Sequence, residues 1–169
     1  METIETILTR KSVRSFENKH IEDEKIETLM KAAMAAPSGV NCQPWEFYVC
    51  KSEEVKKEVK KCIPFGQYNA DIVIITCIKE AKTFALMRDL AHCDLSAATE
   101  NILLAAHDMG LGGVWCAVYP DKLRMKAVKK ALKLPIGITP FSAIYLGYPA
   151  KNDKSKVKEK YDNKKVRII

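Results

Sequence analysis

The chain has 169 residues, of which 47% are hydrophobic and 29% charged, and it carries a net charge of +7 at pH 7. The length suits one domain with a sizeable core, and the composition excludes a disordered chain. No apolar run approaches the roughly 20 residues that span a bilayer, and the opening stretch METIETILTRKSVRSF is not a secretory signal, so we expect a cytoplasmic protein without a membrane partner.

The first half of the chain alternates helical and strand patterns. A short helical pattern at the N-terminus precedes a second helix over 23–36, which opens on acidic residues and which Pro37 ends. A strand over 46–50, a Lys/Glu-rich helix over 52–62 and a strand over 71–78 follow. The last of these, DIVIITCI, is typical of a central strand buried on both faces. The apolar stripes of the three helices are Ile4, Ile7 and Leu8, then Ile26, Leu29, Met30 and Ala33, and lastly Val55 and Val59.

The second half continues this pattern with a long helix over 84–109, a strand over 114–118, a helix over 120–133 and a strand over 142–147. The long helix is apolar nearly all round in its second half, which predicts that a sheet covers one side and something else covers the other. The run VRII at the C-terminus is strand-like but too short to stand alone. This order predicts one domain in which helices sandwich a sheet of about four strands.

Basic residues concentrate near the C-terminus. Residues 151–169 hold eight Lys/Arg and three Asp/Glu, which accounts for +5 of the net charge of +7. Such a segment can bind nucleic acid or an anionic surface, or it can be a solvated terminus, and composition leaves both open.

The six cysteines and three histidines show no metal-ligand spacing and no C-x-x-C pair, so we predict neither a zinc site nor a disulfide framework. Cys50, Cys77 and Cys116 lie inside the strand patterns. A free thiol at such positions packs as a small hydrophobic group.

The segment RKSVR, which begins at Arg10, follows the first helix. If it is extended, alternate side chains share a face, so Arg10, Ser12 and Arg14 converge while Lys11 and Val13 point away. Two guanidinium groups beside a hydroxyl suit a phosphate, because Arg forms forked, charge-assisted hydrogen bonds. The alternative is two surface arginines after a helix.

The stretch PSGVNCQ follows the second helix. Pro37 ends that helix, and Gly39 permits a backbone geometry closed to other residues. By the same alternation, Asn41 and Gln43 face one way and Cys42 the other. Two side-chain amides offer donors and acceptors to the edge of a flat heterocycle, or they cap loops and satisfy backbone groups.

The stretch GLGGVW follows the long helix. Gly110 is placed to cap that helix in a left-handed conformation. Gly112 and Gly113 weaken a strand unless something must approach the backbone closely, and a planar ring lying against N–H groups would explain them. The chain has neither a G-x-G-x-x-G after a first strand nor a G-x-x-x-x-G-K-[ST] loop, so Rossmann and P-loop sites are not supported.

Together these segments resemble the nitroreductase family of FMN-dependent oxidoreductases. The resemblance rests on RKSVR-x-F, AAPSGVNCQPW, DLSAATENILLAAHDMGLGGVW and LGYP, whose order and spacing agree over nearly the whole chain. It implies one α+β domain, residues 1–169, with three layers: a central, mostly antiparallel sheet of about four strands flanked by helices. It also implies a homodimer with FMN sites at the interface. In that dimer the helix over 84–109 would form much of the core, and the extension 151–169 would reach the partner and exchange its last strand.

The resemblance further implies the cofactor site. The RKSVR segment would hold the phosphate and ribityl chain of FMN, the loops after the second and fourth helices would flank its ring, and the basic extension would reach the phosphate. No catalytic side chain and no metal ligand is implied. The cofactor-binding residues by resemblance are Arg10, Lys11, Ser12, Arg14, Pro37, Ser38, Gly39, Asn41, Gln43, Asn69, Asp94, Gly112, Gly113, Lys165 and Arg167.

The activity that the resemblance implies is a ping-pong reduction. Hydride passes from NAD(P)H to FMN, and the electrons then pass to a nitroaromatic, quinone or similar small electrophilic acceptor. One alternative is a flavin enzyme of the same fold with different chemistry, either flavin fragmentation or dehalogenation. The other is a basic nucleic-acid-binding module, although a phosphate role for the extension leads us to expect no nucleic acid partner.

Overall fold

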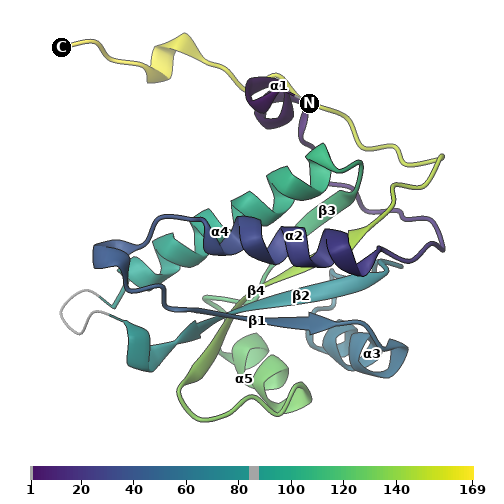
Figure 1. The fold of residues 1–169 in the computed structure, drawn as a ribbon, viewed down its shortest axis with the longest axis vertical. Coiled ribbons are helices and arrows are strands. Elements are labelled where there is room, and N and C mark those ends of the chain that lie inside the picture. The colour runs from purple at the N-terminus through teal and green to yellow at the C-terminus, as the bar shows by residue number, and fades with distance from the viewer. Residues whose placement is uncertain (1, 84–87) are drawn as a thin grey trace.

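The computed structural model describes residues 2–83 and 88–169. These residues form an α+β domain in which helices cover both faces of one sheet (Figure 1). Short 3₁₀ turns (η) join several of the longer elements. In chain order the elements are α1 (Thr3–Thr9), α2 (Asp23–Met34), η1 (Gly39–Asn41), β1 (Trp45–Cys50), α3 (Glu53–Cys62), β2 (Ile72–Lys79), η2 (Glu80–Lys82), α4 (Leu90–Asp108), β3 (Gly112–Ala117), α5 (Lys122–Ala131), β4 (Ile138–Gly147) and η3 (Asn163–Lys165).

The sheet has the strand order β1-β2-β4-β3, and every neighbouring pair is antiparallel. Strand β2 lies inside the sheet and is buried from Ile72 to Ile78, which confirms the prediction from its β-branched, apolar sequence. Cys50, Cys77 and Cys116 are buried in the core, as their strand patterns predict. Strands β1 and β3 form the two edges, and this position matters for the site described below.

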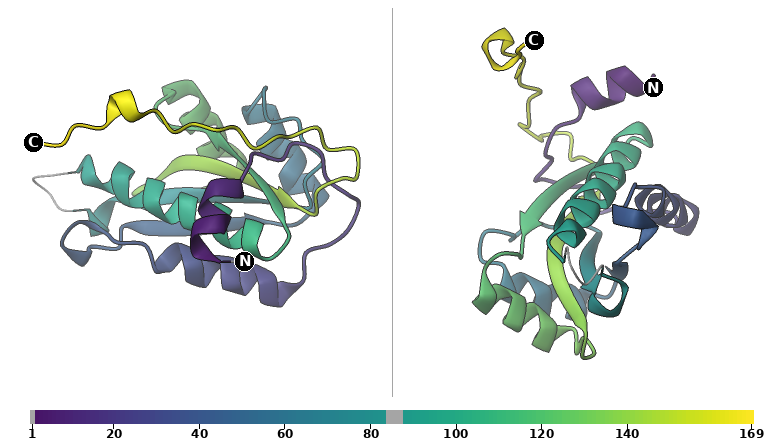
Figure 2. Two further views of the ribbon diagram at one scale, coloured as in Figure 1. Left: turned by 90° about the horizontal axis from the view of Figure 1, so that it is seen from above. Right: turned by 90° about the vertical axis from the view of Figure 1, so that its left-hand side faces the viewer.

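Two pairs of helices complete the predicted three layers. Helices α2 and α4 pack on one face of the sheet, and α3 and α5 pack on the other (Figures 1 and 2). Helix α4 is apolar on more than one side because Leu95 and Ile102 face the sheet while α2 packs beside it. This arrangement supplies the two coverings that the all-round hydrophobicity predicts.

Two element boundaries differ from the predictions by more than two residues. Helix α4 begins at Leu90, because residues 88–89 form a turn, and residues 84–87 of the predicted helix lie outside the described part of the chain. Strand β4 begins at Ile138 rather than 142. Pro140 can occupy this strand because the register with β2 shifts opposite it, between Thr76 and Cys77.

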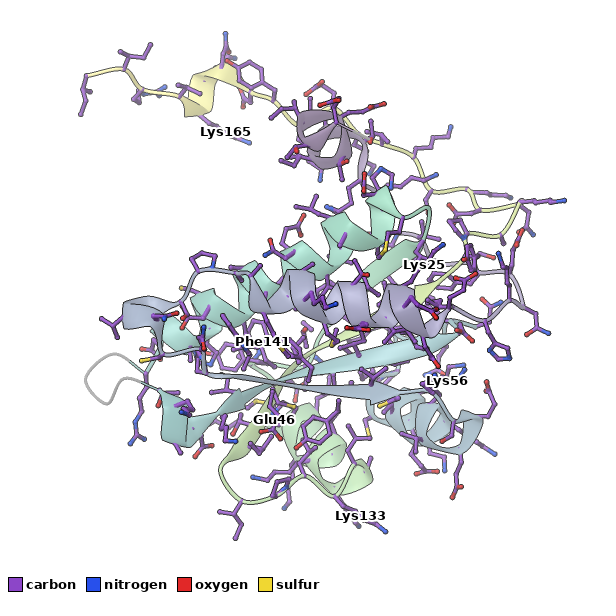
Figure 3. All side chains as sticks on the ribbon, in the orientation of Figure 1. Lys25, Glu46, Lys56, Lys133, Phe141 and Lys165 are labelled. Atoms are coloured by element: carbon purple, nitrogen blue, oxygen red, sulfur yellow. The ribbon has the colours of Figure 1, made fainter. Side chains whose placement is uncertain are left out.

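Helix α1 and the C-terminal segment stand off the body of the domain (Figure 2). The apolar residues Ile4, Ile7 and Leu8 of α1 are all at least half exposed, while Thr9 Oγ1 lies 2.9 Å from Nε2 of His107 on α4. The stripe of α1 is therefore not a core face of this chain. Figure 3 shows Lys165 on the segment that leads away from the sheet, and residues 166–169 have no regular structure.

Within the described ranges, no helix combines the length and hydropathy needed to cross a bilayer.

Candidate functional site

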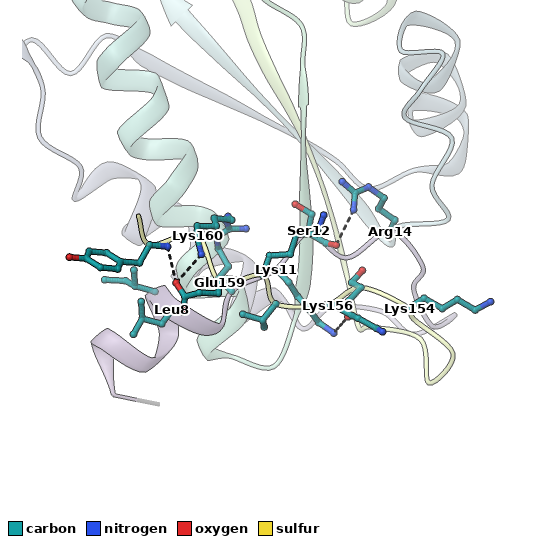
Figure 4. Close-up of a pocket in the computed structure, with 14 residues that line it drawn as sticks. Leu8, Lys11, Ser12, Arg14, Lys154, Lys156, Glu159 and Lys160 are labelled. Carbon is teal, nitrogen blue, oxygen red and sulfur yellow. Dashed lines mark hydrogen bonds between the residues drawn. The ribbon is translucent and has the colours of Figure 1, made fainter. Parts of the chain in front are cut away.

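A pocket of about 870 Å³ opens between the linker that follows α1 and the C-terminal segment (Figure 4). Arg10, Lys11, Ser12 and Arg14 line one side, so the three residues expected to converge in the RKSVR segment do lie on one pocket. Residues 154–161 line the other side. The pocket therefore joins the RKSVR segment to part of the basic extension 151–169.

The linker is positioned by the edge of the sheet. Ser12 forms a parallel bridge with Gly113, and the Val13 N–H donates to the Gly113 carbonyl at 3.0 Å. Val13 is buried, as the predicted alternation requires. Lys11 was expected to point away with Val13 but lines the pocket, because its Nζ donates to the Ser155 carbonyl at 2.8 Å.

The charges around the pocket are strongly unbalanced. Arg10 Nε lies 3.0 Å from a carboxylate oxygen of Glu100, and Lys11 Nζ lies 3.6 Å from Asp153, so both cations are partly neutralised. Arg14 is exposed, and its Nη1 donates to the Ser12 carbonyl at 3.3 Å. Seven cationic side chains but only one carboxylate, that of Glu159, are among the described residues lining the pocket. A phosphorylated ligand would balance this excess.

Glycine is required at two positions of β3 for a different reason from the predicted one. A Cβ on Gly112 would lie 2.7 Å from Val13, and a Cβ on Gly113 would lie 2.9 Å from Leu103 and Leu146. The close approach that excludes a side chain is therefore made by the protein's own core. Packing therefore accounts for both glycines without a planar ligand, and their proposed role in cofactor binding stays a prediction.

The free edge of β3 adds polar groups next to the linker. The Gly113 carbonyl accepts from the Val13 N–H, so the backbone groups of Gly113 point away from β4. In an antiparallel pair every second residue points the same way, so the backbone groups of Trp115 and Ala117 also point away from β4. Arg124 Nη1 donates to the Ala117 carbonyl at 2.9 Å. The edge thus presents the N–H groups of Trp115 and Ala117 beyond the point where the linker pairs.

The PSGVNCQ residues form a second cluster at the other end of α4. They are not extended: Val40, Asn41 and Gln43 have φ of 44°, 56° and 49°. The extended backbone from which the alternation was inferred is therefore wrong, although Asn41 and Gln43 are exposed and Cys42 between them is partly buried. Gly39 was expected to adopt a backbone geometry closed to other residues, but its φ is not left-handed. It is small because a Cβ there would lie 3.0 Å from Leu90.

One chain does not bring the two clusters together. Gly39 N–H donates to Asp94 Oδ1 at 3.0 Å near the start of α4, whereas Thr9 meets His107 near its end. Thirteen residues of helix between these contacts correspond to about 20 Å. Figure 1 shows the same separation, with η1 at one end of α4 and the linker after α1 at the other.

The remaining predicted residues are occupied within the chain. The Asn69 side chain accepts from the Phe16 N–H at 3.2 Å and donates to the Phe16 carbonyl at 2.8 Å. Lys165 lies 3.8 Å from Asp162, and Arg167 donates to carbonyls of its own segment. Neither Lys165 nor Arg167 lines the pocket.

Sequence reasoning expected the basic extension to reach the phosphate but singled out Lys165 and Arg167, not the lysines that close the pocket. They are Lys154, Lys156, Lys158 and Lys160. Their signal was the K-x-K-x-K-x-K spacing, which places alternate side chains together on an extended segment. Arg124 was also missed. It pairs with Asp121 at 3.1 Å and lies over the ring of Phe65, with 4.7 Å between the guanidinium carbon and the ring centroid.

The chain is similar in sequence and in structure to proteins of one family. The sequence model of the nitroreductase family matches residues 7–66 and 64–148. A protein of Archaeoglobus fulgidus with the provisional name NADH dehydrogenase/NAD(P)H nitroreductase is 45% identical over 150 residues, which are 88% of this chain and 86% of that protein. The solved structure of a Parabacteroides distasonis protein with the same provisional name superposes with a TM-score of 0.92 at 38% identity, over 99% of this chain and 98% of that one. An FMN-dependent nitroreductase of Clostridium difficile superposes with a TM-score of 0.86 at 28% identity, over 98% of each chain.

Proposed function

This chain belongs to the nitroreductase family, and from that premise we propose that it is an FMN-dependent oxidoreductase. It takes hydride from NAD(P)H and reduces small electrophilic acceptors, such as nitroaromatics or quinones, in a ping-pong cycle. The similarity to a protein named as an NAD(P)H nitroreductase and to an FMN-dependent nitroreductase supports this proposal. Family membership alone does not choose the acceptor.

The observation that carries the proposal is the cation-rich pocket beside the edge of β3. Its donor set fits FMN: Arg10, Lys11 and Arg14 offer charge to a phosphate, and the Ser12 hydroxyl adds a neutral donor. The N–H groups of Trp115 and Ala117, which point outward from the same edge of β3, lie a few residues further along the strand and can donate hydrogen bonds.

The chain's contribution to catalysis is binding and orientation. Bound FMN would supply the redox chemistry, accepting hydride from NAD(P)H and returning electrons to the acceptor. The linker cations would hold the phosphate end of FMN, and the N–H groups at the β3 edge would stabilise negative charge on its ring. We assign no side chain as a general acid or base.

The active form that we propose is a homodimer. Residues 37–43 of one copy would complete the pocket of the other, because a single chain leaves them about 20 Å from the linker. The exposed stripe of α1 and the exposed 166–169 segment would then be covered by the partner. Lys165 and Arg167 would reach the partner's phosphate in the same way.

One experiment tests the activity. We expect the purified full-length protein to show a flavin absorption spectrum that bleaches under nitrogen on addition of NADH or NADPH and recovers on addition of a quinone. A colourless protein that takes up no FMN from excess would refute the proposal. Flavin that binds but is not bleached by either nucleotide would support fragmentation or dehalogenation chemistry instead. Strongly salt-dependent binding of RNA or DNA by a colourless protein would support the nucleic-acid alternative.

A further inference from the structure

Residues 38–43, here called the strained loop, combine an unfavourable backbone with high exposure. Val40, Asn41 and Gln43 have positive φ, and Val40 is 73% exposed. A β-branched residue at positive φ is a genuine outlier, whereas Asn tolerates this region. An exposed valine gains little by packing that could offset the strain. Something outside these side chains must therefore hold the loop in this conformation.

Asp94 provides that restraint. Its side chain comes from the second turn of α4, the residue is 7% exposed, and its Oδ1 accepts the Gly39 N–H at 3.0 Å. Gly39 itself rests against Leu90 of the same helix. A buried carboxylate needs such a donor, so the tether serves both partners.

The loop is also bonded internally. The Gln43 N–H donates to Ser38 Oγ, and the Cys42 N–H donates to the Gly39 carbonyl, each at 3.0 Å. These bonds close the loop on itself but do not attach it to the body of the protein. The contacts that attach its first half to α4 pass through Gly39, to Asp94 and Leu90.

We propose that Asp94 is a positioning residue that keeps the strained loop in one preformed conformation, ready to meet the flavin bound to a second copy. This inference rests on the proposed function. In this role Asp94 acts through the hydrogen bond that it accepts from Gly39. Without the tether, Val40 and Gln43 relax toward negative φ, so the binding-competent conformation becomes a minor one and the apparent affinity falls by that fraction.

The test compares variants of the full-length chain freed of flavin. FMN is titrated in, the Kd is read from quenching of flavin fluorescence, and the thermal midpoint is measured separately. Asp94→Ala should weaken FMN binding about tenfold or more, while Asp94→Asn, whose amide oxygen still accepts the Gly39 N–H, should stay within about threefold of the wild type. Hydrogen exchange at residues 39–43 should be faster in Asp94→Ala only.

Asn101→Ala is the matched control. Asn101 Nδ2 donates to the Ala32 carbonyl at 3.0 Å, so it also links α4 to the α2 side of the domain, but without touching the loop. This variant should lower the thermal midpoint and leave the Kd for FMN unchanged. Val40→Asn tests the strain itself and should raise the thermal midpoint, because Asn tolerates φ of 44° better than Val.

The outcomes separate this inference from the proposed function. A wild-type chain that never binds FMN refutes the proposed function. If the wild type binds FMN but Asp94→Ala binds it equally well, Asp94 does not position the loop. An Asn variant as weak as the Ala variant, or an Asn101→Ala variant that weakens FMN equally, would show a general packing effect and overturn the inference. If Asp94→Ala fails to fold, the other two variants decide. A tenfold loss of FMN affinity in Asp94→Asn, or a lower thermal midpoint in Val40→Asn, would overturn the inference.

Discussion

Removing the Arg14 guanidinium should weaken the binding of FMN while leaving the stability of the fold almost unchanged. The side chain is exposed, and among the described residues its guanidinium makes one hydrogen bond, at 3.3 Å to the Ser12 carbonyl. We therefore expect Arg14→Ala to change the free energy of unfolding by no more than about 0.5 kcal/mol. A charge-assisted bond to a phosphate contributes about 1.5–3 kcal/mol, so the Kd for FMN should rise about 10- to 150-fold.

The assay is a fluorescence titration of FMN into flavin-free protein, paired with urea unfolding of the same samples. Arg14→Lys should fall between the wild type and the Ala variant, because it keeps the charge and loses the fork. Lys57→Ala, which removes an exposed cation of α3 that does not line the pocket, is the control and should change neither quantity. A Kd for Arg14→Ala within about threefold of the wild type would refute the phosphate role. A large loss of stability would show that Arg14 supports the fold instead.

Three further predictions concern the supports of the site. Gly112→Ala should lower the free energy of unfolding by about 1–3 kcal/mol in a urea titration, because its Cβ would lie 2.7 Å from Val13; an unchanged value would contradict this close packing. Burial and the nearby cations Arg10 and Lys11 lower the pKa of His107, so the unfolded state binds more protons and stability should decline as the pH falls below about 6.5. His107→Gln should remove that part of the pH dependence of the thermal midpoint, and an identical slope would exclude His107 as its source. Deleting residues 162–169 should convert the proposed dimer to a monomer in sedimentation, and a truncated chain that remains dimeric would rule out strand exchange as the basis of dimerisation.

The elements of this fold were largely predictable because they are decided by local pattern and burial. The unbroken β-branched run of β2 can be buried on both faces only between two layers of helices, and the strand is buried from Ile72 to Ile78. Ser52 begins α3 as a side-chain cap, accepting from the Val55 N–H at 3.3 Å, in keeping with the helix predicted from residue 52. Boundaries were less predictable: Pro140 made residues 138–141 look unlike a strand, and only the register shift in β2 accommodates it.

Side-chain roles were harder to predict where a distant segment supplies the partner. Lys56 belongs to a Lys/Glu-rich helix and looks like a solvated residue, yet it is 3% exposed. Its Nζ donates to the Ala70 and Asp71 carbonyls at 3.3 and 2.6 Å, at the entrance to β2. No spacing along α3 records where those carbonyls lie. The lysines that close the pocket do show a regular spacing, but that spacing does not record that the linker after α1 lies opposite them.

The sequence by itself determined the composition of the site: a cluster of arginine, lysine and serine after the first helix, an amide-bearing loop after the second, and a glycine pair entering a strand. Tertiary structure decided what each does. The close packing of Val13 and Leu103 explains the glycines. Asp94 holds the amide loop in a conformation that is not extended. About 20 Å of α4 separates that loop from the arginines. Hydrophobic periodicity is a property of neighbours along the chain, whereas a binding site depends on which distant segments the folded core brings to the same surface.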